Sequence, residues 1–282
     1  MLIVGTGAVA TLLAERVFDA GVPFQVFGTP SERLRSLDAR FPGCSVSDPA
    51  KVALHDCWIV AVKAGQNREK VRALSVAPSP SRILVLQNGF RPEADWRDLS
   101  SRVDRGLSTY GVKSRAPGFI TGGERGCITV SEGSPFAALL RGLGFLVAEE
   151  PDLSPAIWRK LSVNASLNVV AALYDVCNGE TLEISEAREL VRAAALEVEE
   201  IARAGGVEFG PRSGWEVTRE VVTLTAGNIC STLADVRSGR RSEYDQINGE
   251  ILAAAEKWGV PAPTLRFLDL EFRKLGTTME AA

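Results

Sequence analysis

The chain has 282 residues, about twice the usual size of one domain, so two domains are expected. The apolar fraction of 45% and the charged fraction of 24% are those of an ordinary globular protein, which excludes a disordered or fibrous chain. The 32 basic and 35 acidic side chains leave a net charge of -3, so no strongly basic surface for nucleic acid or membrane is expected. Small-molecule chemistry is favoured.

The counts of histidine and cysteine restrict the chemistry further. A single histidine, His55, excludes multi-histidine metal sites, so the catalytic proton donor is expected to be another residue type and no metal is expected. The five cysteines never show Cys-X-X-Cys spacing, which supports neither a disulfide framework nor a zinc site. The apolar N-terminal run lacks basic residues and is interrupted by Glu15 and Arg16, so neither a signal peptide nor a membrane anchor is expected. A reducing cytoplasm fits best.

Short β-rich runs alternate with helical periods in the first half of the chain. Strands are predicted at residues 2–4, 24–27, 58–62 and 83–86. Such alternation predicts a mostly parallel sheet with right-handed crossovers. Short extended pieces at 118–121 and 127–130 are expected to complete the sheet, and a helix is expected at 134–143.

Long helical periods dominate the second half. They are expected at residues 154–174, 185–204, 211–225, 242–258 and 263–275. Two prolines, Pro151 and Pro155, mark a domain junction near residues 149–154. The sequence therefore predicts an α/β Rossmann domain at 1–150, followed by an all-α domain at 151–282.

A glycine-rich turn follows the first predicted strand directly. Its residues are Gly5, Thr6, Gly7, Ala8, Val9 and Ala10, a GxGxxA pattern that leads into an amphipathic helix. Gly5 permits a tight turn, Gly7 lets a pyrophosphate approach the backbone, and Ala10 allows close packing of helix and strand. The phosphate is expected at the positive end of the helix, which predicts dinucleotide binding.

The residues at the end of the second predicted strand indicate whether the dinucleotide is NAD or NADP. NAD-binding proteins place an acidic residue there, and this chain instead has Gly28 and Thr29, followed by Arg33 and Arg35. The arginines favour the 2′-phosphate of NADP. Alternatively, they solvate the face of a helix.

The segment from Trp158 to Tyr174 combines a long uncharged stretch with a polar stripe. Lys160, Asn164 and Asn168 lie at i, i+4 and i+8, on one face of a helix that is expected to be buried. Asparagine is a poor helix former, so its presence indicates a cleft. A partly desolvated lysine there could protonate a developing alkoxide. The alternative is a stripe that binds a neighbouring helix or ordered water.

Five blocks in the same order resemble the ketopantoate reductase family over almost the whole chain. They are the turn at Gly5, Val62-Lys63-Ala64-Gly65-Gln66, Gln87-Asn88-Gly89, the Lys160 helix with Asn178-Gly179-Glu180, and the segments Ser231–Arg237 and Arg240–Gly249. The resemblance implies a Rossmann domain that binds NADPH and a helical domain that closes over a 2-keto acid.

The resemblance also assigns roles to single residues. Lys160 would donate the proton, held in place by a carboxylate such as Glu243. The substrate contacts would be Asn164, Asn168, Asn178 and Ser231. The cofactor contacts would be Gly5 to Ala10, Lys63, Gln66, Asn88, Val112 and Glu243. Thr29 departs from the family, which commonly has an arginine after the second strand, and this weakens the preference for NADP over NAD.

Three of these positions have alternative explanations from the residues alone. Asn88 can stabilise an Asn-Gly turn, and Ser231 can bond its own backbone. Glu243 can be an ion-pair partner of Arg240 or Arg241. We interpret these two arginines and Arg237 mainly as structural, with contact of one of them to the cofactor as the alternative.

The expected function is NADPH-dependent reduction of a 2-keto acid, foremost 2-dehydropantoate (ketopantoate) to pantoate in pantothenate biosynthesis. The alternatives are a β-hydroxyacid dehydrogenase, which also has a lysine and an asparagine four residues apart, and a non-catalytic regulator that senses NADP. The expected partner is a small 2-keto acid, without nucleic acid or membrane, and a homodimer is one possible assembly.

Overall fold

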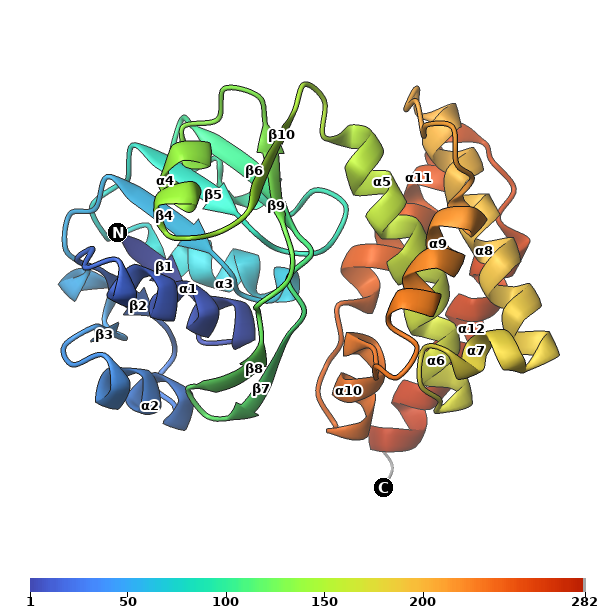
Figure 1. The fold of residues 1–282 in the computed structure, drawn as a ribbon, viewed down its shortest axis with the longest axis horizontal. Coiled ribbons are helices and arrows are strands. Elements are labelled where there is room, and N and C mark those ends of the chain that lie inside the picture. Colours follow the sequence, from blue (N-terminus) through green and yellow to red (C-terminus); the bar gives the residue numbers. More distant parts are fainter. Residues whose placement is uncertain (281–282) are drawn as a thin grey trace. The chain divides into compact units, whose positions relative to one another are not determined.

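The structure is a computed structural model that describes residues 1–280, with the side chains of 276–280 left out. The last two residues of the expected domain at 151–282 therefore lie outside the described chain. The chain forms two compact units, which we call unit 1 (Met1–Leu153) and unit 2 (from Ser154 onward). Unit 1 contains the strands, and unit 2, coloured yellow-green to red in Figure 1, is helical.

Unit 1 is built on a mostly parallel sheet. Its strands are β1 (Leu2–Val4), β2 (Gln25–Phe27), β3 (Ser45–Val46), β4 (Cys57–Val60), β5 (Arg82–Val85), β6 (Val103–Ser108), β7 (Val112–Ala116), β8 (Phe119–Gly122), β9 (Ile128–Ser131) and β10 (Val147–Glu150). Within the described residues, the main sheet has the order β10-β9-β6-β5-β4-β1-β2-β3. Among the described strands of this sheet, only the β6–β9 pair is antiparallel. The predicted strands near residues 2, 24, 58 and 83 are confirmed.

One predicted strand has a different partner from the one expected. The extended piece at 118–121 becomes β8, which pairs with β7 in a separate two-stranded sheet instead of completing the main one. The reason is local: Gly118 has a φ of +71° and forms a tight turn that folds β8 back onto β7. The expectation that this strand completes the main sheet was wrong.

Helices cover both faces of the main sheet. They are α1 (Ala8–Asp19), α2 (Glu32–Arg40), α3 (Asn67–Leu74) and α4 (Phe136–Gly142), with short 3₁₀ turns η1 (Pro49–Lys51), η2 (Ala64–Gln66) and η3 (Pro92–Trp96). Alternate strand residues enter different cores: Ile59 packs with α1 and α4, whereas Trp58 and Val60 pack with α3 and η3. A sheet buried on both faces explains why its strands are apolar runs without alternation.

Unit 2 contains only helices among its described residues. They are α5 (Ser154–Val163), η4 (Asn164–Asn168), α6 (Val169–Tyr174), α7 (Glu180–Glu183), α8 (Ser185–Ala204), α9 (Gly214–Leu224), α10 (Ser231–Arg237), η5 (Asp245–Gly249), α11 (Glu250–Trp258) and α12 (Pro263–Glu280). The α5–η4–α6 helix runs through the unit and is largely buried, as predicted. The segments η4 and η5 are π-helical, a feature that the sequence did not predict. No helix within residues 1–280 is both long enough and apolar enough to cross a bilayer.

Candidate active site

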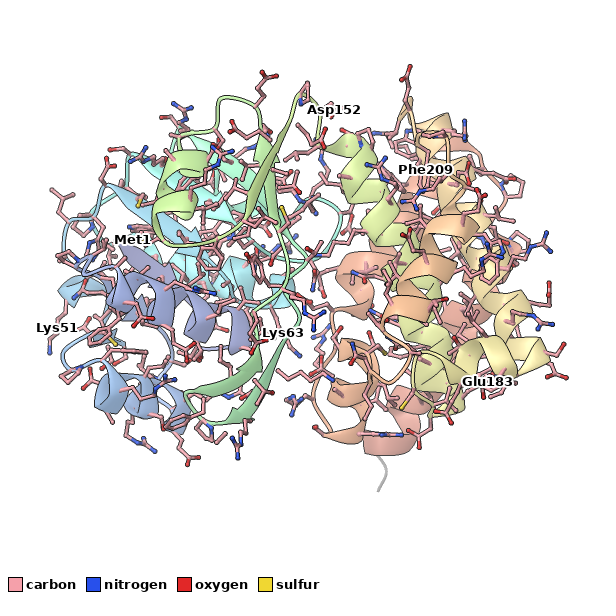
Figure 2. All side chains as sticks on the ribbon, viewed as in Figure 1. Met1, Lys51, Lys63, Asp152, Glu183 and Phe209 are labelled. Atoms are coloured by element: carbon pink, nitrogen blue, oxygen red, sulfur yellow. The ribbon has the colours of Figure 1, made fainter. Side chains whose placement is uncertain are left out.

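One group of candidate residues lies at the carboxyl ends of the central strands of unit 1. Chain order reverses at β1, whose neighbours are β2 on one side and β4 on the other. In open α/β sheets, ligands bind at such a reversal, outside the carboxyl ends of the strands. The turn at Gly5 follows β1, Lys63 follows β4 and Asn88 follows β5. The sheet therefore brings these predicted residues to one edge, and Figure 2 shows that Lys63 lies apart from Met1, the residue before β1.

Gly5 is required by the backbone of the turn. Its φ is +131°, and a Cβ there would lie 2.8 Å from the carbonyl oxygen of Ala61. The Gly5 amide also donates to the Phe27 carbonyl at 2.9 Å. A side chain at this position would therefore strain the turn and push apart the ends of β1 and β4.

Gly7, unlike Gly5, has open space beside its Cα. It is the N-cap of α1 with an ordinary φ of -80°, and no side chain caps the helix there. A Cβ on Gly7 would meet no protein atom within 4 Å. The first amides of a helix need acceptors and carry a partial positive charge, which suits an anionic phosphate. The turn from Gly5 to Ala10 therefore fits the pyrophosphate of a dinucleotide.

A buried amide network fixes the two neighbouring loops. Gln87 Nε2 donates to the Val62 carbonyl at 2.8 Å and to Asn67 Oδ1 at 2.6 Å. Asn67 Nδ2 in turn donates to the Pro92 carbonyl at 3.0 Å. Gln87 thus joins the end of β5 to the segment between β4 and α3, on which Lys63 and the exposed Gln66 lie. Asn67 is not recognisable from the sequence, because an asparagine at the start of a helix resembles an ordinary cap.

An arginine of β6 binds the backbone of the loop that carries Asn88. Arg105 of β6 is buried, and its guanidinium donates to the carbonyls of Gly89 and Phe90. Glu93 Oε2 lies 3.5 Å from Arg105 Nη1. Burial lowers the pKa of Arg105, and the Glu93 carboxylate opposes that shift. The Asn88 loop is therefore fixed by a charged group as well as by its Asn-Gly turn.

Val112 lies at the start of β7. Because β6 runs parallel to β5, the segment that follows Ser108 leaves the sheet at the same edge as Asn88. Val112 is partly buried against the core beneath α1. Its position at this edge is compatible with a cofactor contact.

A second group of candidate residues lies on the α5–η4–α6 helix of unit 2. Lys160 is in the last turn of α5, and Asn164 and Asn168 begin and end η4. Asn168 Nδ2 lies 3.5 Å from Asn164 Oδ1, so the two amides share one face, as the stripe predicted. Asn168 is buried, and Lys160 and Asn164 are partly exposed.

Side chains from other segments bind the backbone of η4. Asn248 Nδ2 of η5 donates to the Ala165 carbonyl at 2.9 Å. Cys230 Sγ, which caps the N-terminus of α10, lies 3.5 Å from the Asn168 carbonyl. These contacts bring the segments that precede Ser231 and follow Glu243 to the Asn164–Asn168 helix. The roles of Asn248 and Cys230 were not predicted from the sequence.

Asn178 is held by the segment that follows α9. Its amide N–H donates to the Asn228 carbonyl at 2.9 Å, and its Nδ2 donates to Thr225 Oγ1 at 2.9 Å. Its Oδ1 is buried and has no hydrogen-bond partner within the described part of the protein. A buried acceptor without a donor is costly, so a bound hydroxyl or water at this atom would be stabilising. Ser231, by contrast, is exposed as the first residue of α10.

Three arginines near Glu243 in the sequence form ion pairs with aspartates. Arg240 Nε lies 3.1 Å from Asp235 Oδ1, and Arg241 Nη2 lies 3.2 Å from Asp245 Oδ2. Arg237 likewise pairs with Asp175. These pairs agree with the structural role expected for the three arginines.

His55 lies away from these residues. Its Nε2 is 2.9 Å from Gln25 Oε1, and its Nδ1 is 3.1 Å from the Met1 amino group, at the start of the parallel strands. Within residues 1–280, no cluster of three potential metal ligands occurs, and all five cysteines are free. The geometry therefore assigns His55 a structural role.

Comparison with known proteins gives a family match for each of the two units. Residues 1–135 match the family described as ketopantoate reductase PanE/ApbA, and residues 152–270 match its C-terminal part. The 2-dehydropantoate 2-reductase of Pyrobaculum aerophilum is 30% identical over 275 residues, 94% of each chain. The chain belongs to the ketopantoate reductase family. This family member is accordingly an oxidoreductase.

Solved structures show the same fold as this ketopantoate reductase family member. A PanE/ApbA family ketopantoate reductase from Ralstonia eutropha JMP134 has a TM-score of 0.89 at 23% identity, covering 99% of this chain and 100% of its own. D-mandelate dehydrogenase, solved with NADH and anilino(oxo)acetate, has a TM-score of 0.88 at 19% identity, covering 99% of each chain. The expected combination of a Rossmann domain with a helical domain is confirmed.

Proposed function

We propose that this protein reduces 2-dehydropantoate (ketopantoate) to pantoate with NADPH, a step of pantothenate biosynthesis. The observation that carries the proposal is the Lys160–Asn164–Asn168 stripe on a buried helix, whose backbone is bound by side chains from two other segments. The names of the sequence relatives, 2-dehydropantoate 2-reductase, support the choice of substrate.

Unit 1 is assigned to the nucleotide. The uncapped amides at the start of α1 and the open space at Gly7 suit a pyrophosphate, and Lys63, Gln66, Asn88 and Val112 are proposed as further contacts. A nicotinamide nucleotide would supply the hydride that reduces the keto carbon. The NADH bound by D-mandelate dehydrogenase supports the class of cofactor and leaves the choice between NAD and NADP to experiment.

Unit 2 is assigned to the keto acid. Lys160 would donate a proton to the carbonyl oxygen as negative charge develops there, with Glu243 holding the ammonium. Asn164, Asn168, Asn178 and Ser231 would bind the carboxylate and hydroxyl groups. The unpartnered Oδ1 of Asn178 supports this assignment, because it offers a substrate hydroxyl an acceptor that no described side chain uses.

The deciding experiment is NADPH oxidation with a panel of 2-keto acids, including ketopantoate and benzoylformate, by the wild type and Lys160→Ala. We expect turnover of ketopantoate and a loss of about 10²- to 10⁴-fold in kcat for Lys160→Ala, with nucleotide binding retained. Lys257→Ala, an exposed lysine of the same unit, is the matched control.

Each contrary result favours a particular alternative. Near wild-type turnover by Lys160→Ala would exclude Lys160 as the proton donor. Nucleotide binding without turnover of any keto acid would favour a regulator that senses NADP, and activity only on β-hydroxyacids would favour that class of dehydrogenase. We expect a cytoplasmic enzyme, and sedimentation at assay concentration would test for a homodimer.

A further inference from the structure

A buried lysine lies at the end of β2. Lys70 of α3 is 5% exposed, and its ammonium donates to Thr29 Oγ1 at 3.2 Å. The same ammonium lies 6.0 Å from the ring centroid of Phe27, the last residue of β2. The contact joins residues 41 positions apart in the sequence and places a positive charge just beyond the strand.

Within the described part of the chain, the charge of Lys70 is only weakly compensated. Its carboxylate partner is Glu69, at 3.0 Å, whose side chain is 66% exposed and belongs to the neighbouring residue. Exposed carboxylates contribute little to holding a charge, because water competes for them. Lysine is seldom this buried without strong pairing, so an anionic ligand at this position would be stabilising.

Lys70 lies at the place where Rossmann folds distinguish NAD from NADP. In Rossmann folds, the end of the second strand binds the adenosine ribose: a carboxylate there accepts from the 2′-hydroxyl of NAD, whereas a cation binds the 2′-phosphate of NADP. Here Gly28 and Thr29 take that place. A Cβ on Gly28 would lie 2.5 Å from Thr6 Cγ2, so this segment packs directly against the phosphate-binding turn.

We propose that Lys70, together with the Thr29 hydroxyl, binds the 2′-phosphate of the nucleotide and selects NADP over NAD. This inference rests on the proposed function. It supplies from α3 the cation that the sequence lacks at Thr29 and that the sequence analysis sought in Arg33 and Arg35 of α2. Glu69 would turn towards solvent when the phosphate binds, as the high exposure of its side chain allows.

The test is direct binding to the ligand-free protein, without turnover. NADPH and NADH are titrated by fluorescence, and adenosine 2′,5′-bisphosphate and 5′-AMP by calorimetry. Lys70→Met should weaken NADPH and the bisphosphate by about 10- to 100-fold, as expected for loss of a charge-assisted hydrogen bond, and leave NADH and 5′-AMP nearly unchanged. Lys70→Arg should retain most of the preference.

Two further variants separate the possible sources of selectivity. Arg33→Met should have a smaller effect on NADPH than Lys70→Met, because Arg33 is exposed on α2. Glu69→Gln should keep or strengthen NADPH binding, because it removes a competing anion. Thermal unfolding of each ligand-free variant checks that the fold is retained.

The inference is overturned if Lys70→Met weakens all four ligands equally, if only Arg33→Met lowers NADPH affinity, or if Glu69→Gln weakens NADPH binding. A wild type that binds NADH and 5′-AMP as tightly as their 2′-phosphorylated counterparts also overturns it, while keto-acid reduction stands. A wild type that binds none of the four ligands refutes the proposed function and this inference together.

Discussion

Asn248 donates its Nδ2–H to the carbonyl oxygen of Ala165 at 2.9 Å and thereby joins the two π-helical segments of unit 2. A π-helical segment shifts the backbone bonding from i+4 to i+5, and such segments are common at functional sites. Asn248 is 2% exposed, so its bond is protected from water. The bond fixes the backbone between Asn164 and Asn168.

Replacing Asn248 by alanine should affect both stability and substrate binding. The buried Ala165 carbonyl would lose a donor, which should lower the free energy of unfolding by about 1–3 kcal/mol. The stripe would also lose its alignment, so KM for the keto acid should rise by several fold while NADPH affinity stays near wild type. Denaturant titration and steady-state kinetics measure the two effects, with Gln246→Ala of η5 as the control. A destabilised variant with an unchanged KM would show that the bond supports only the fold.

The helices and strands were predicted well wherever a local pattern defines them. Helix α8 spans residues 185–204 as expected, because its apolar period is regular and Gly205 follows it. The π-helical turn of η4 escaped prediction, because five residues do not distinguish i+4 from i+5 bonding. Strand β8 was assigned to the wrong sheet, since its turn with β7 determines the pairing and the hydropathy pattern does not.

The candidate site residues likewise divide into those that a local sequence pattern defines and those that contacts between elements define. The turn from Gly5 to Ala10 is recognisable because its chemistry is contained in six consecutive residues. Two other contacts cannot be recognised in the sequence: the one between Lys70 and Thr29 and the one between Arg105 and Gly89. Each of them links residues of different elements. In the sequence, Lys70 and Arg105 resemble ordinary surface charges, and only the fold shows that both are buried.

Alanine at Gly5 and at Gly7 should have opposite effects. Gly7→Ala has an allowed backbone and no atom within 4 Å of the new methyl, so the fold should keep its stability within about 1 kcal/mol. A methyl at the mouth of the turn should nevertheless weaken NADPH binding by tenfold or more, if the pyrophosphate lies there. Gly5→Ala should instead destabilise the ligand-free protein by roughly 1–3 kcal/mol, through strain at φ +131° and contact with Ala61.

Thermal unfolding with and without NADPH distinguishes these two effects. Gly7→Ala should melt like the wild type without nucleotide and gain less stability when the nucleotide is added. If Gly7→Ala keeps full affinity for NADPH, the pyrophosphate does not approach this residue and the assignment of the turn is wrong.

Arg105→Met should loosen the Asn88 loop. The change leaves the carbonyls of Gly89 and Phe90 without their donor and Glu93 without its partner, which should cost about 2–4 kcal/mol of stability. Faster hydrogen exchange confined to the Asn88 loop would show the local effect. Arg102→Met, an exposed arginine just before β6, is the matched control and should leave both measurements unchanged. Equal exchange in the two variants would contradict a bracing role for Arg105.

Acidification should destabilise unit 1 through His55. Burial and, secondarily, the Met1 ammonium lower the pKa of His55 to about 4, whereas an unfolded chain titrates near the ordinary 6.5. Between these values the unfolded state binds a proton that the folded state does not, so the free energy of unfolding should fall as the pH drops from about 6.5 to 4 and be unaffected above that range. The loss should be well below the ~3 kcal/mol that a fully buried imidazole would show, because the ring is partly in solvent. Denaturant titration at pH 5 and pH 7.5 of the wild type and His55→Gln measures it, since the difference between the two proteins cancels the carboxylates common to both. An equal pH dependence in both proteins would contradict the assignment.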